Sequence, residues 1–73
     1  MNIKRLVAMA NDIATYFNSE PDHAAAVEGV RNHLNKYWDP VMRRQIMAHV
    51  AAGDDDELLP LAREAIDRLT GSR

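Results

Sequence analysis

The sequence predicts an all-α protein, a compact array of four short helices in a single domain that spans residues 1–73. Apolar residues recur at the three- and four-residue intervals of a helical face along most of the chain. Pro, Gly and capping residues divide this pattern into segments of helix length. No alternation of apolar and polar residues indicates a β-strand. We expect the helices at about residues 3–17, 20–37, 40–52 and 58–69.

The first predicted helix has one continuous apolar stripe. The stripe consists of Ile3, Leu6, Val7, Ala10, Ile13, Ala14 and Phe17. Met9 and Tyr16 widen it on one side, whereas Lys4 and Asp12 point elsewhere. Residues at this spacing face the same way, so the stripe is expected to pack into the core.

The second predicted helix begins at the segment 19–22. Ser19 can accept a hydrogen bond from the Asp22 amide, and Pro21 suits the first turn of a helix. Its apolar side is expected to consist of Val27, Val30, Leu34, Tyr37 and Trp38. Gly29 lies in the middle of this helix, where Gly costs up to about 1 kcal/mol relative to Ala. It indicates either simple tolerance or a close approach of a second helix.

Asp39-Pro40 is the clearest helix boundary in the chain. Pro40 disfavours helical geometry at Asp39, and Asp39 can cap a new helix that has Pro40 at its first position. The inward face of this third helix is predicted to carry Met42, Ile46, His49 and Val50. Gly53 suits the left-handed conformation that ends a helix.

The fourth predicted helix follows an acidic run at residues 54–57, where carboxylates favour the positive end of a helix. Its apolar stripe consists of Leu58, Leu61, Ala62, Ala65, Ile66 and Leu69. We expect Pro60 in the first turn and Gly71 at the end of the helix.

Length and composition exclude several classes of protein. A chain of 73 residues buries only about 60% of its unfolded surface, so it needs regular helix packing or a partner for stability. The absence of cysteine excludes a disulfide framework and a thiolate metal site. A net charge of −2 predicts neither nucleic acid nor membrane as a partner. No apolar stretch reaches the roughly 20 residues of a membrane span, and no signal peptide is recognisable, so we expect a cytoplasmic protein.

The residues that could carry chemistry do not form a recognisable motif. No two histidines have the i, i+4 spacing of metal ligands; the three are His23, His33 and His49. The acidic run lacks the ligand order of a calcium-binding loop. The hydroxyl groups are expected at helix surfaces, caps or the C-terminal tail, away from a base. We therefore predict no catalytic, cofactor-binding or metal-binding residue in this chain.

The segment 37–44 combines the only Trp with Tyr, Met and Arg, residue types that protein interfaces concentrate. The predicted partner contacts are Tyr37, Trp38, Asp39, Pro40, Met42, Arg43, Arg44 and His49. Trp38 also suits a core position, and one face of a tight corner can be core while the other is exposed. DNA binding through Arg43 and Arg44 is disfavoured, because the fourth helix of a helix-turn-helix would present its acids to phosphate.

Around this segment the chain resembles a known family. The similar blocks, in chain order, are 9–11, 13–17, 33–34, 37–43, 48–53 and 58–61. They resemble the delta subunits of NAD-dependent, molybdenum- or tungsten-containing formate dehydrogenases, and Trp38-Asp39-Pro40 is the most specific block. Two positions depart from the family pattern. Val41 replaces a basic residue, and Leu59 stands where a capping Asp or Ser is common, which favours an earlier start of the fourth helix.

This resemblance implies a non-catalytic accessory subunit that docks on an enzyme oxidising formate to carbon dioxide and stabilises it or helps to assemble it. The implied complex carries a molybdenum or tungsten pterin cofactor, iron–sulfur clusters and FMN, and this chain binds none of them. The implied partners are the large catalytic (alpha) subunit and the beta and gamma subunits. The alternative is a free-standing helical adaptor or regulatory domain that binds a peptide or helix in a groove.

Overall fold

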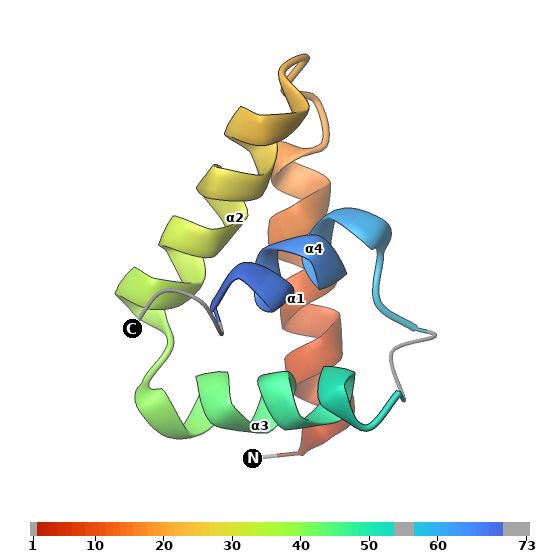
Figure 1. Ribbon diagram of the computed structural model, residues 1–73, viewed down its shortest axis with the longest axis vertical. Coiled ribbons are helices and arrows are strands. Elements are labelled where there is room, and N and C mark those ends of the chain that lie inside the picture. The colour runs from red at the N-terminus through yellow and green to blue at the C-terminus, as the bar shows by residue number, and fades with distance from the viewer. Residues whose placement is uncertain (1, 54–56, 70–73) are drawn as a thin grey trace.

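The computed structural model describes residues 2–53 and 57–69, and these residues form four α-helices and no strand (Figure 1). The helices are α1 (Ile3–Phe17), α2 (His23–Tyr37), α3 (Pro40–Ala51) and α4 (Pro60–Leu69). The all-α prediction is confirmed. The radius of gyration of 11.0 Å is that of a compact chain of this length.

The first two helices form an antiparallel hairpin that the other two complete. Residues 18–22 join α1 to α2 at one end of the hairpin, and α3 crosses the opposite, open end (Figure 1). The chain then returns as α4, which packs against all three preceding helices. The core lies where these four elements meet.

The predicted apolar stripes of α1 and α4 form most of this core. The buried residues of α1 are Leu6, Val7, Ala10 and Ala14. Those at and before α4 are Leu58, Leu61, Ala62, Ala65, Ile66 and Leu69, the whole predicted stripe. In α3 Ile46 is fully buried, and Met42 and Val50 pack against the core from its edge. A helix stripe of this kind is therefore a reliable guide to burial in this chain.

The predicted start of α2 is three residues too early. Asp22 is the N-cap, and its carboxylate accepts hydrogen bonds from the amides of Ala24 at 3.1 Å and Ala25 at 3.5 Å. Ser19 and Pro21 lie before the helix. Both Ser and Asp are good caps, and Asp22 directly precedes the helical residues whose orphan amides it binds.

The start of α4 also differs from both predictions. The helix begins at Pro60, neither at residue 58 nor earlier. Leu59 has no capping group, and the Asn11 side chain of α1 binds this segment instead. It accepts a hydrogen bond from the Leu59 amide and donates one to the Glu57 carbonyl, each at 2.8 Å. Residues 54–56 and Gly71, to which further predictions referred, lie outside the described residues.

The predicted apolar side of α2 is correct except for Tyr37. Val27, Val30, Leu34 and Trp38 are buried, whereas Tyr37 is 65% exposed. The backbone leaves the helix at Trp38, where φ is −89° and ψ is 139°. Because of this turn the indole enters the core and the preceding tyrosine ring stays at the surface.

Gly29 lies against an aromatic ring of the neighbouring helix. A Cβ atom at this position would be 2.4 Å from Cε1 of Phe17, closer than any real contact. The interpretation of Gly29 as a close approach between helices is therefore confirmed, and α1 is the helix that approaches. At the end of α3, Gly53 has a φ of 84°, which confirms the predicted left-handed position.

Candidate functional site

The corner between α2 and α3 has the predicted capping geometry. The Asp39 carboxylate accepts a hydrogen bond from the Met42 amide at 2.9 Å, and Pro40 occupies the first turn of α3. Asp39 is extended, with φ −77° and ψ 167°, as a residue before proline prefers. This pair therefore ends one helix and begins the next.

Arg43 closes the corner from the side of α3. Its guanidinium donates hydrogen bonds to the carbonyls of Leu34 at 3.4 Å, Asn35 at 3.2 Å, and Trp38. These carbonyls belong to the last turn of α2 and its C-cap, the negative end of the helix dipole, which attracts a cation. Arg43 is thus bound within the fold, and Arg44 is the exposed member of the pair.

The eight predicted contact residues divide into two groups. Trp38 is only 4% exposed, and Met42, Arg43 and His49 are half-buried. The exposed members are Tyr37, Asp39, Pro40 and Arg44. The assignment of these eight residues as partner contacts stays a prediction. The surface that the corner offers a partner is that of the exposed group.

A groove between α1 and α2 begins beside this corner. It has a volume of about 440 Å³ and is lined by Asp12, Ile13, Tyr16, Phe17, His33 and Tyr37. Tyr16, at 77% exposure, and Tyr37, at 65%, are the most exposed large apolar side chains of the described residues, and both line this groove. Of its six residues, only Tyr37 was predicted from the sequence as a partner contact. The position of Tyr16 at the edge of the α1 stripe was the signal that pointed here.

Aromatic contacts organise the walls of the groove. The Tyr16 and Phe17 rings meet edge to face, with centroids 5.0 Å apart. On the opposite wall, formed by α2, the centroids of the His33 and Tyr37 rings are 4.7 Å apart, and the ring planes are tilted by 45°. The Phe17 ring can lie against α2 because Gly29 has no side chain. The groove thus owes its shape to the glycine as much as to the rings.

Two opposite charges flank the groove. Asp12 is exposed on the α1 side and makes no ion pair within residues 2–53 and 57–69. On the α2 side, the Lys36 ammonium is 5.6 Å from the centre of the Tyr37 ring, a cation–π distance. A carboxylate therefore lines the groove, and an ammonium lies beside the Tyr37 ring of its α2 wall.

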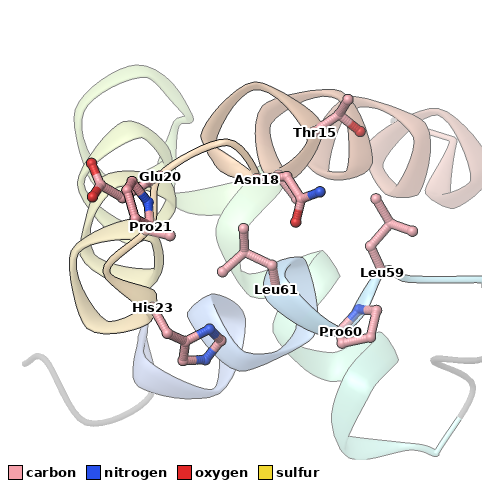
Figure 2. Close-up of a pocket in the computed structure, with 10 residues that line it drawn as sticks. Thr15, Asn18, Glu20, Pro21, His23, Leu59, Pro60 and Leu61 are labelled. Carbon is pink, nitrogen blue, oxygen red and sulfur yellow. The ribbon is translucent and has the colours of Figure 1, made fainter.

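A second hollow lies where the C-terminal end of α1 meets the first turns of α2 and α4 (Figure 2). Its volume is about 350 Å³, and its lining mixes polar and apolar side chains, among them Asn18, His23 and Leu61. His23 Nε2 is 2.7 Å from Glu64 Oε1, which links α2 to α4 at the surface. The Thr15 hydroxyl donates to the Asn11 carbonyl at 2.8 Å. His23 and Thr15 thus have hydrogen-bond partners within the fold.

Metal-binding residues do not gather in the part of the chain that the structure describes. No group of three or more His, Asp or Glu side chains there could hold a metal ion. Nor is any helix of that part long and apolar enough to cross a membrane. His33 and His49 are half-buried at the edge of the helix packing.

One ion pair on α2 has a clear electrostatic consequence. Arg31 donates two hydrogen bonds to the Glu28 carboxylate, at 3.0 and 3.1 Å. These bonds, with the charge of Arg31, lower the pKa of Glu28 and raise the pKa of Arg31. The pair lies on the surface of α2 and stabilises the helix at the i, i+3 spacing.

A protein-family model matches almost the whole of the chain. It is the family described as NADH-dependent formate dehydrogenase delta subunit FdsD, and the match covers residues 5–66. The chain belongs to this family. The resemblance that the sequence analysis drew from six short blocks is thereby confirmed. No curated protein and no solved structure matches this delta-subunit chain.

Proposed function

We propose that the chain is a non-catalytic accessory subunit of an NAD-dependent formate dehydrogenase, and that it docks on the enzyme and stabilises it or helps to assemble it. The family match over residues 5–66 carries this proposal. The match extends through all four helices, so it concerns the folded domain as a whole.

The residue types of the chain suit a docking role. The sequence contains no cysteine, the residue whose thiolate holds most iron–sulfur clusters. Its exposed aromatic residues, in contrast, are of the types that carry binding energy at interfaces. We therefore assign the molybdenum or tungsten pterin, the iron–sulfur clusters and FMN to the partner subunits.

A partner would also stabilise the domain itself. Among the described residues, the core consists of 16 buried apolar side chains, several of them from alanine. A core of this size gives only a small free energy of unfolding. Any partner that binds only the folded state of the chain raises that free energy. We propose the large catalytic (alpha) subunit as the principal partner, with the beta and gamma subunits in the same cytoplasmic complex.

The proposal is tested by expressing the formate dehydrogenase of the same organism with and without this chain. We expect that omission lowers the yield of intact complex or shortens its half-life on warming, while the enzyme that does assemble keeps its turnover of formate. Intact mass and formate-dependent NADH formation measure the two effects. An equal yield and an equal half-life in both preparations would contradict the proposed role.

A further inference from the structure

The groove between α1 and α2 is an open, largely apolar site lined by the two most exposed large apolar side chains of the described residues. Large apolar side chains are usually covered, and aromatic residues that are not covered concentrate at binding surfaces. Here Tyr16 and Tyr37 lie 21 positions apart in sequence and line the same groove. Val41 and Leu59, the other exposed large apolar residues of the described chain, do not line it.

We infer that this groove receives an apolar side chain from an α-helix of a partner formate dehydrogenase subunit, and that the same helix carries a Lys or Arg residue that pairs with Asp12. This inference rests on the proposed function and names the surface and the chemistry of the docking. The Trp38 indole, which is buried, has no part in it.

The shape of the groove selects the kind of segment that fits. It follows the seam between two antiparallel helices, a seam into which side chains of a third helix pack. A volume of about 440 Å³ lies within the range of pockets for small ligands, so at least one large side chain fits there. The faces of Phe17 and Ile13 provide its apolar contacts.

The charges around the groove select the partner residue that lies next to the apolar side chain in the groove. Asp12 is exposed beside the groove and lacks an ion pair within the described chain. A cation one turn from the apolar anchor would reach this carboxylate, and an acidic partner residue near the Tyr37 ring would meet Lys36. An acidic partner residue in place of this Lys or Arg would be repelled by Asp12.

A second copy of this chain fits the groove poorly. A two-fold dimer whose axis passes through the groove would place one hollow against the identical hollow, and both would stay unfilled. A helix of a larger subunit supplies the convex shape that a second copy lacks.

Affinity measurements on five variants test the inference. Each variant is titrated against the formate dehydrogenase of the same organism purified without this chain. Tyr16→Ala and Tyr37→Ala remove exposed side chains of the groove, and Asp12→Lys reverses its carboxylate. We expect each to weaken binding at least about tenfold, the effect of losing an interface anchor. The matched controls Val41→Ala and Glu57→Lys are exposed and outside the groove, and we expect less than about threefold change.

Circular dichroism checks that all five variants keep their helicity. If wild-type chain binds and the three groove variants bind equally well, the groove inference is wrong and the proposed function stands. If wild-type chain does not bind the enzyme at all, the proposed function and the inference both fall. If light scattering shows a wild-type dimer that Tyr16→Ala dissociates, while enzyme binding is unchanged, the groove is a homodimer surface and the inference is overturned.

A photocrosslinking residue in place of Tyr16 tests the partner chemistry directly. We expect it to crosslink to one subunit, on a predicted helix with an apolar residue and a Lys or Arg one turn away. The same crosslinker at Val41 is the control. A crosslink to a loop, or to a helix with only acidic neighbours, would contradict the inference.

Discussion

At the scale of single residues, the contact between Gly29 and Phe17 has the most consequences. The ring of Phe17 occupies the space that any side chain at position 29 would need. This contact brings α1 and α2 together and also forms the inner wall of the docking groove. A glycine that is unfavourable for the helix by itself is therefore favourable for the packing of the pair.

Gly29→Ala is expected to destabilise the protein by about 1 kcal/mol, the net of an overpacking cost of about 1–3 kcal/mol and a helix gain of about 1 kcal/mol. Chemical denaturation measures the change. The double variant with Phe17→Leu should lose less than the sum of the two single changes, because the shorter side chain makes room. A single variant more stable than the wild type would contradict the close packing.

Glu28 and Arg31 make a pH-dependent contribution to stability. The pKa of Glu28 is lower in the folded chain than its ordinary value of 4.5, so the charged carboxylate favours the folded state. This contribution is present above pH 4.5 and is lost as the pH falls through the lowered pKa of Glu28 in the folded chain. Arg31→Gln should raise the pKa of Glu28 toward 4.5 in a titration followed by NMR. An unchanged titration curve would show that Arg31 is not the cause.

At the scale of elements, the helix ends depend on two different kinds of cap. Asp39 caps α3 from the adjacent position, which the sequence pattern predicted. Asn11 holds the start of α4 from a different helix, 48 positions before Leu59. A local cap depends on neighbouring residues alone, whereas this distant one exists only once α1 and α4 have packed.

Asn11→Ala is expected to cost about 1–2 kcal/mol of unfolding free energy, since it leaves the Leu59 amide and the Glu57 carbonyl without their partner. Asn11→Asp keeps the acceptor and loses the donor, so its cost should be smaller. Asn32→Ala, an exposed position on α2, is the control. Thermal unfolding of the four proteins measures these differences. Equal melting temperatures for Asn11→Ala and the wild type would contradict the cap.

Asp39→Ala should lower stability by about 1 kcal/mol because the Met42 amide loses its acceptor. Asp39→Asn retains a capping oxygen and is expected to stay within a few tenths of a kcal/mol of the wild type. Urea denaturation compares the three proteins. If Asp39→Asn lost as much stability as Asp39→Ala, the charge of Asp39, and not its hydrogen bond, would stabilise the corner.

These elements also show what could be predicted from the sequence. The apolar stripes and the Asp39-Pro40 boundary follow from spacing and local chemistry, and they were predicted correctly. The start of α2 was misplaced because Ser19 and Asp22 are both suitable caps and the sequence does not rank them. Tyr37 and Trp38 are adjacent, and the backbone turn that decides which is buried is a tertiary feature. The groove was not predicted because its walls come from two helices whose relative position the packing decides.

At the scale of the whole molecule, the four helices make a small domain with an aromatic groove beside its most characteristic sequence block. Within that block, the buried Trp38 and the half-buried Arg43 stabilise the corner. The neighbouring Tyr37 belongs to the groove. The corner and the groove are thus joined through Tyr37 alone, and a partner bound at the groove would also stabilise the junction of α2 and α3.

Affinity purification of the tagged chain from its native host tests the central claim, that it is a stable subunit of formate dehydrogenase. Mass spectrometry and metal analysis identify what is purified with it. We predict large flavin and iron–sulfur subunits and molybdenum or tungsten, all in near-stoichiometric amounts. A chain purified alone, or with unrelated proteins and without either metal, would contradict the claim.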